Sequence, residues 1–160
     1  KCNQADITTK NGLWIIKPRA NSSDQLNIEV YARVNDKDML MGSHTYRVKN
    51  LPRPDAYFEI NGVPTEEMRI PRAQLINPKN RIVASYGADG LIQAKFDIVG
   101  FQVKLPTGAS LSVKGDRFDN KTLAAIKKLK QGNTINLMYI KAKGPDGKEI
   151  QLRGLPIELN

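Results

Sequence analysis

Apolar residues recur at every second position in part of the first fifty residues, which is the period of β-strands. Residues 26–34 show this best, because apolar side chains at even positions alternate with mostly polar ones and predict a half-buried strand. Further strands are predicted at 13–17 and 39–49. An immunoglobulin-like (Ig-like) sandwich needs about seven strands, so residues 1–51 are expected to form the C-terminal half of such a domain.

An incomplete sandwich leaves an apolar face uncovered. We therefore expect these strands to lean on the following domain, on a neighbouring molecule, or on a second copy of the chain that exchanges strands. The chain begins at Lys1 with neither an initiator methionine nor a signal peptide. We expect a fragment whose targeting signal lies upstream.

A connector is predicted at Leu51, Pro52, Arg53 and Pro54. Neither proline can donate a ladder hydrogen bond, so a preceding strand ends here. Each proline also pushes the residue before it toward an extended conformation. The segment should be a short, stiff hinge between two domains, because proline-rich links are far stiffer than Gly/Ser links.

Residues 52–160 have the pattern of a complete β-rich, sandwich-like domain that carries one α-helix. Most of its apolar stretches are short and are bounded by Gly, Pro or Asn, as strands are. One segment has the spacing of a helix instead: Asp119 can cap it, residues 120–131 carry an apolar stripe, and Gly132 ends it. The predicted fold class is mainly β.

The longest strand pattern runs from Leu91 to Leu105. Its apolar residues lie at even positions up to Ile98 and at odd positions afterwards, so the phase changes at Val99 and Gly100. A strand cannot change phase without a bulge or a bend. We predict one long strand that turns a corner and contributes to two sheets.

Two final strands are predicted near 134–142 and 149–159. The sequence between them is Gly144-Pro145-Asp146-Gly147, which is typical of a hairpin turn. Proline presets the first turn angle, and glycine accepts a positive φ.

The chain has 25 basic and 16 acidic residues and a net charge of +9, which favours acidic partners, membrane surfaces or nucleic acid. The basic residues form no run and aromatic residues make up only 6% of the chain, so nucleic acid is disfavoured. Two alternatives stay open: an Ig-like adhesin or carbohydrate-binding module, favoured by β content and exposed loops, and more weakly a nucleic-acid binder.

Residues of the types that perform catalysis or bind metals are isolated from one another. His44 is the single histidine and lacks the partners of a zinc site. Glu66 and Glu67 are adjacent, so their side chains should diverge. Cys2 is the single cysteine, which excludes an internal disulfide and leaves open a bond to an upstream cysteine. With no phosphate-binding or dinucleotide motif, we predict no catalytic residue, cofactor, metal or small-molecule substrate, and hence no enzyme.

Three segments resemble the GldM/PorM family, whose members are periplasmic shaft proteins of the type IX secretion and gliding machinery. They are Met-Gly-Ser-His-Thr-Tyr-Arg-Val-Lys at 41–49 with Leu-Pro-Arg-Pro at 51–54, Gly-Asp-Arg-Phe at 115–118 with the predicted helix and its glycine, and Ile-Lys-Ala-Lys-Gly-Pro-Asp-Gly at 140–147. The family usually has Pro-Asp-Pro in the connector, so Arg53 is a departure. The order and spacing of the segments carry the resemblance.

The resemblance implies a homodimeric, non-enzymatic structural component of the periplasm that transmits force. It would be anchored in the inner membrane through an upstream segment and would meet a motor protein there. Its last domain would reach an outer-membrane-associated ring formed by a lipoprotein and its partner.

Two groups of residues are candidates for that partner contact. The first is Lys121, Lys127 and Lys128 on the predicted helix, and the second is Pro145, Asp146 and Gly147 in the predicted hairpin. A plain solvated surface is the alternative at both places. The sequence offers no metal ligand and no nucleic-acid site beside them.

Overall fold

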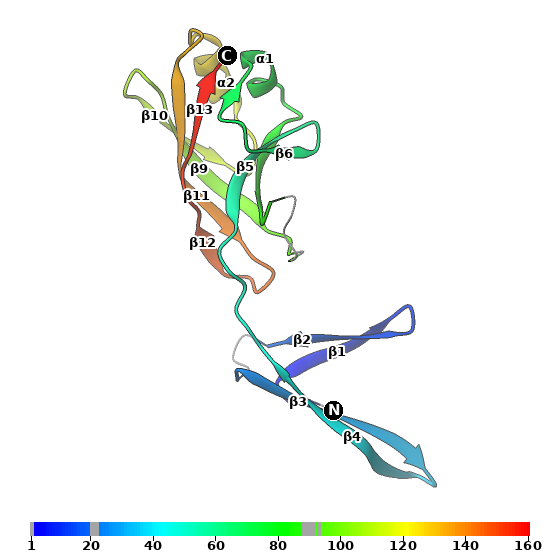
Figure 1. Cartoon of the computed structure of the whole chain (residues 1–160). Helices are drawn as coiled ribbons and strands as arrows, with labels where there is room; N and C mark the ends of the chain where they lie inside the picture. The colour runs from blue at the N-terminus through cyan, green and yellow to red at the C-terminus, as the bar shows by residue number, and fades with distance from the viewer. Residues whose placement is uncertain (1, 20–22, 88–91, 93) are drawn as a thin grey trace. The chain divides into compact units, whose positions relative to one another are not determined.

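The computed structural model describes residues 2–19, 23–87, 92 and 94–160 of the chain (Figure 1). The fold is mainly β, with sheets that form a sandwich-like arrangement, so the predicted fold class is confirmed. The chain divides into two compact units, unit 1 (Lys1–Pro52) and unit 2 (Arg53–Asn160). The boundary between them falls inside the predicted connector.

Unit 1 consists of two antiparallel hairpins, each a separate two-stranded sheet. The strands are β1 (Ala5–Lys10), β2 (Leu13–Pro18), β3 (Gln25–Val34) and β4 (Lys37–Arg47). Among its described residues, just Ala5 and Leu26 are buried apolar side chains. Two strands alone cannot enclose a core, so most of the apolar residues of this unit remain exposed.

The β3–β4 hairpin has one apolar face and one polar face. On the apolar face, Val30 is 59% exposed, Met39 53% and Tyr46 50%. On the polar face, Ser43 donates a hydrogen bond to the Asn27 side chain across the strand pair. Residues 1–51 therefore have the alternation of a half-buried sheet without a layer of their own to bury it.

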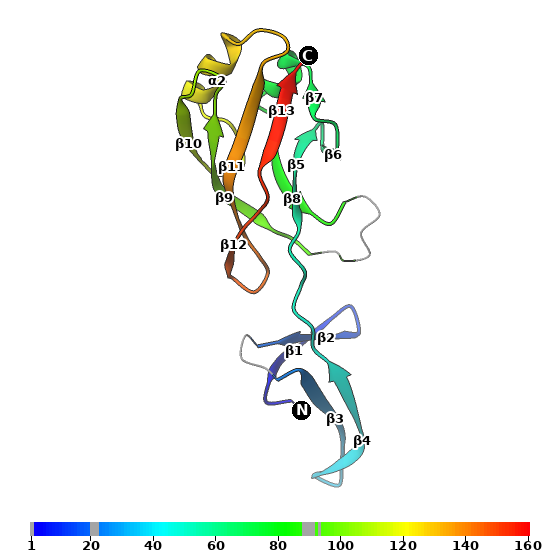
Figure 2. The same ribbon diagram turned by 60° about the vertical axis from the view of Figure 1, so that its left-hand side comes forward.

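The described residues of unit 2 form two sheets and two helices. The strands are β5 (Asp55–Ile60), β6 (Val63–Thr65), β7 (Arg69–Ile70), β8 (Arg81–Ser85), β9 (Asp97–Lys104), β10 (Ser110–Lys114), β11 (Thr134–Lys143), β12 (Glu149–Gln151) and β13 (Leu155–Leu159), and the helices are α1 (Arg72–Leu75) and α2 (Asn120–Lys127). The large sheet has six strands in the order β10-β9-β11-β13-β7, with β12 beside β11 (Figure 2). The small sheet has the order β6-β5-β8.

One apolar core joins both sheets and both helices of unit 2. Its largest fully buried side chains include Phe58, Ile70, Leu75, Ile82, Ile126, Ile135, Leu137, Ile140, Ile157 and Leu159. Each such side chain contributes about 1.5–3 kcal/mol by leaving water. Unit 2 thus has the core that unit 1 lacks.

The phase change predicted at Val99 and Gly100 is a β-bulge in β9. Ile98 and Phe101 are both buried, while Val99 between them is exposed. The prediction of a long strand that serves two sheets is wrong, because β9 begins at Asp97 and pairs only within the large sheet. The bulge absorbs the extra residue without a corner. Residues 91 and 93 of the predicted strand lie outside the described residues.

Strand β11 has a matching bulge that the sequence pattern did not reveal. Its pairing with β9 shifts between Met138 and Lys141, and Tyr139 there has a φ of +51°. Leu137 and Ile140 are both fully buried, so β11 also changes phase. The two strands therefore change phase at the same level of the sheet.

The helix prediction is right in its position and wrong in its end. Asp119 is the N-cap of α2, as predicted, but the helix ends at Lys127 rather than 131. The chain then continues in a tighter, 3₁₀-type turn, because the backbone N–H groups of Lys128 and Leu129 each donate to the carbonyl three residues earlier. Helix α1, one turn after Pro71, was not predicted.

The hairpin predicted at 144–147 is present between β11 and β12. The Gly147 N–H donates to the Gly144 carbonyl at 3.0 Å, and Gly147 has a φ of +79°. The predicted last strand is divided in two, since β12 ends at Gln151 and β13 begins at Leu155.

Gly100→Ala is expected to destabilise residues 52–160 by about 1–3 kcal/mol. A Cβ at this position would lie 2.7 Å from the Val113 carbonyl oxygen, which is a backbone atom that cannot swing away. Urea unfolding followed by circular dichroism measures the change. Ser112→Ala on the facing strand is the control and should change the stability by less than about 0.5 kcal/mol. Equal effects of the two substitutions would contradict the close approach.

Candidate interaction surfaces

The three lysines predicted on the helix are exposed. Lys121 and Lys127 lie within α2, and Lys128 is its C-cap. The carbonyls at the end of the helix are satisfied from elsewhere, because Arg72 donates to the Leu129 carbonyl at 2.8 Å and to the Lys127 carbonyl at 3.4 Å. The lysine side chains are therefore not needed to close the helix.

The first turn of α2 is held by Asp119. Its carboxylate faces the side chain of Thr122 and accepts a hydrogen bond from the Thr122 backbone N–H at 2.8 Å, and these contacts lower the pKa of Asp119. The positive charge of Lys121 adds a smaller effect in the same direction. Burial of Thr122 and Ile126 fixes which face of α2 meets solvent.

The hairpin residues Pro145, Asp146 and Gly147 are exposed as well. The Asp146 carboxylate already accepts a hydrogen bond from the Lys148 backbone N–H at 3.1 Å. Its local role is thus to close the turn. Contact of these residues with a partner stays a prediction.

The two candidate groups lie at opposite ends of unit 2 (Figures 1 and 2). Helix α2 precedes the start of β11 and the hairpin follows its end. Strand β11 has ten residues and so spans about 30 Å. The structure does not bring the two groups together, and they form two separate surfaces.

The predicted hinge residues differ in burial. Leu51 is 44% exposed, and Pro52 and Arg53 are exposed, whereas Pro54 is buried just before β5. Backbone hydrogen bonding within unit 1 extends to Val48, whose N–H donates to the Asp24 carbonyl at 2.8 Å. The role of residues 51–54 as a hinge stays a prediction.

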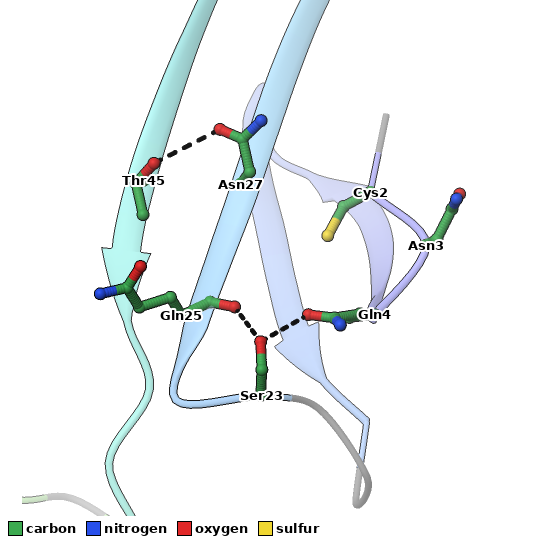
Figure 3. Close-up of a pocket in the computed structure, with 7 residues that line it drawn as sticks. All are labelled: Cys2, Asn3, Gln4, Ser23, Gln25, Asn27 and Thr45. Atoms are coloured by element: carbon green, nitrogen blue, oxygen red, sulfur yellow. Dashed lines mark hydrogen bonds between the residues drawn. The ribbon is translucent and has the colours of Figure 1, made fainter.

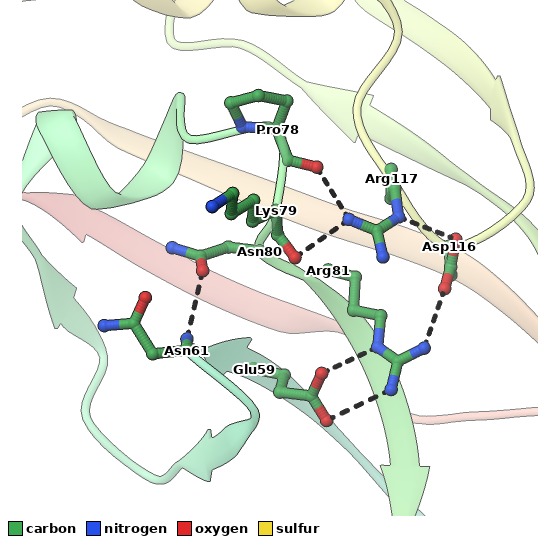
Figure 4. A network of polar contacts seen from close by, with 8 residues as sticks. All are labelled: Glu59, Asn61, Pro78, Lys79, Asn80, Arg81, Asp116 and Arg117. Carbon is green, nitrogen blue, oxygen red and sulfur yellow. Dashed lines mark hydrogen bonds and ion pairs between the residues drawn. The ribbon is translucent and has the colours of Figure 1, made fainter.

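Unit 2 carries a polar network that the sequence analysis did not predict (Figure 4). Arg81 on β8 donates to the Glu59 carboxylate at 2.7 Å and lies 3.6 Å from a carboxylate oxygen of Asp116. The hydrogen bond to Glu59 is the largest cause of the raised pKa of Arg81. The Asp116 carbonyl also accepts from the Ile82 N–H at 2.8 Å. The network therefore ties the small sheet to the loop after β10.

Arg117 extends this network to the segment before β8. Its guanidinium donates to the carbonyls of Pro78 and Lys79 at 2.6 and 2.8 Å (Figure 4). The segment Gly-Asp-Arg-Phe at 115–118 is the part of the sequence that could have indicated this network, because it contains both Asp116 and Arg117. These contacts pair charges with backbone and with carboxylates, so their role is structural.

Each unit has a pocket that is lined by described residues. The pocket in unit 1 is lined by Cys2 and by polar side chains, among which Ser23 donates to the Gln4 side chain at 3.0 Å (Figure 3). The second, in unit 2, is lined by Arg53, Asp55, Gln151, Leu152 and Arg153. Neither combines a nucleophile with a base.

The described residues include no group of three or more His, Cys, Asp or Glu side chains that could hold a metal ion. His44 packs edge-on against Tyr46 with ring centroids 4.6 Å apart, as a strand residue does beside its neighbour. No helix in the described part of the chain has the length and hydrophobicity to cross a membrane.

Comparison with known families gives one match. The family model described as the GldM C-terminal domain matches residues 52–160, which is well over half of the chain. No curated protein matches the sequence.

Asp119→Ala is expected to destabilise residues 52–160 by about 1 kcal/mol at pH 7, because α2 loses its cap. The pKa of Asp119 is lower in the folded chain, so its contribution is present above its unfolded pKa of about 3.9 and is lost as pH falls through the folded pKa. Urea unfolding at pH 7 and pH 3 measures the difference, which should shrink at the lower pH. Asp119→Asn is the control, since it keeps a capping oxygen. A deficit in the Ala variant that is the same at both pH values would contradict the assignment.

Proposed function

The chain belongs to the GldM C-terminal domain family, and on that basis we propose that it is a structural, force-transmitting part of the type IX secretion and gliding machinery. The match over residues 52–160 is the observation that carries the proposal. Family membership implies a component of this machinery and a structural role rather than a known enzyme activity. Catalysis is no part of the proposed role.

The proposed location is the periplasm, with an inner-membrane anchor in a part of the protein upstream of this chain. Through that upstream part the protein would receive work from an inner-membrane motor protein. The last domain would deliver it to an outer-membrane-associated ring of a lipoprotein and its partner. A fold built from a well-packed core suits this task, because packed interiors transmit strain.

The proposed assembly is a homodimer. The support is the exposed apolar face of β3–β4 in unit 1, with Val30, Met39 and Tyr46 each at least half exposed. Exposed apolar faces of this kind mark sites where a protein meets another protein or a membrane. We propose that residues 1–51 are the C-terminal half of an Ig-like domain and that two copies bring such layers together.

The proposed hinge is Leu51 to Pro54. Two prolines in four residues restrict the backbone at this point. A restricted connector transmits displacement between domains, whereas a Gly/Ser connector absorbs it.

A pull-down tests the proposal. Residues 1–160 and, separately, 52–160 are immobilised and exposed to detergent-solubilised outer membranes from the source cells, then washed at rising salt. We expect the ring lipoprotein and its partner to stay on both baits, because the matched domain is the proposed docking end. Light scattering on the two proteins should give a dimer for 1–160.

An unrelated basic β-sandwich of similar charge serves as the control, since a net charge of +9 alone can retain acidic proteins. Retention on the longer bait alone would move the contact to residues 1–51 or to the dimer. Loss of every ring component at salt levels that also clear the control would contradict the proposed function.

A further inference from the structure

The paired bulges of β9 and β11 turn Tyr139 out of the core. In an unbroken strand Tyr139 would follow Leu137 to the buried face. The bulge instead places Ile140 there, fully buried, and leaves Tyr139 52% exposed. An aromatic side chain of this size is thus presented to solvent from the middle of a sheet.

Tyr139 adopts this position in an unfavourable backbone conformation. Its φ is +51°, a region where the Cβ of an L-residue is crowded and where Gly or Asn is usual. Strained residues of this kind persist where the surrounding structure holds them, and they concentrate at functional sites. Burial does not explain the tyrosine, because its ring adds little to the core.

The residues around Tyr139 form a surface that we call the bulge face. Its members are Val99, Gly100, Lys114, Met138, Tyr139 and Lys141. Val99 is 41% exposed at the facing bulge, and Met138 is half-buried. Gly100 lies in register between Lys114 and Lys141, so a position without a side chain separates two lysines. The result is a small apolar area with a basic rim.

The two lysines of the bulge face have no carboxylate partner. Lys114 and Lys141 make no ion pair with any described residue. By contrast, Glu158 is 3.2 Å from Arg69 on the same sheet. The uncompensated lysines favour a partner that carries carboxylates.

We propose that the bulge face docks an acidic protein surface and that Tyr139 is its anchor. This inference rests on the proposed function, since the partner would be a component of the outer-membrane-associated ring. Tyrosine is enriched among the residues that dominate binding energy at interfaces, and charged rims steer the encounter.

The other basic surfaces lack this combination. The lysines of α2 and the pocket lined by Arg53 and Arg153 have charge but no exposed aromatic residue beside them among their described members. The hairpin at 144–147 closes on its own hydrogen bonds. These three surfaces provide the positions with which Tyr139 is compared in the crosslinking experiment below.

Site-specific photocrosslinking in the source cells tests the proposal on the full-length protein. A photoreactive phenylalanine analogue replaces Tyr139 and, in separate strains, Lys121, Asp146 or Arg153. Mass spectrometry identifies each crosslinked protein. We expect position 139 to crosslink to a ring component through an acidic segment, in greater yield than the other three positions.

The outcomes separate this inference from the proposed function. Crosslinks to the ring from Lys121, Asp146 or Arg153 but not from 139 would overturn the bulge face and leave the proposed function standing. A crosslink from 139 to a second copy of the chain would also overturn it. No ring crosslink from any position would count against both.

Tyr139→Gly separates binding from folding. Glycine accepts the positive φ, so the variant should keep or gain thermal stability. Its affinity for the crosslinked ring component should nevertheless fall at least about tenfold. Tyr139→Phe is the matched control and should keep most of the affinity. Wild-type affinity in the Gly variant would overturn the role of Tyr139.

Discussion

The structure of unit 2 depends on β9 and β11 changing phase at the same level. Because side chains alternate with a period of two, either strand without its bulge would turn the core residues beyond that point toward solvent. The bulge at Val99 keeps Ile98 and Phe101 inside, and the bulge at Tyr139 does the same for Ile140. The core shared by the two sheets follows from this pairing, and so does the outward aromatic ring.

Part of this fold is visible in the sequence. The bulge in β9 can be predicted because Ile98 and Phe101 flank a residue pair that includes a glycine. The bulge in β11 cannot, because Met138, Tyr139 and Ile140 are all apolar and hide where the phase changes. The N-cap of α2 was predictable from local chemistry. The end of α2 was not, since contacts from Arg72, far away in the sequence, close it.

The candidate surfaces are harder to predict than the fold, because they depend on register. Lys114 and Lys141 flank Gly100 only through pairing of strands distant in the sequence. The lysines of α2 could be identified from the sequence because the pattern that predicts a helix involves only residues close together in the chain. Unit 1 shows a similar limit of sequence-based prediction. The alternation of apolar and polar residues identifies the apolar face of its strands, but it does not identify what packs against that face. The family match to residues 52–160 covers the unit that has an apolar core of its own.

The proposed transmission of force through the connector can be tested by measuring export of type IX cargo in cells whose Leu51–Pro54 is replaced with a Gly/Ser segment of equal length. We expect the last domain still to dock and cargo export to fall sharply, because the flexible segment absorbs displacement. Export at the wild-type level with the Gly/Ser segment in place would contradict it.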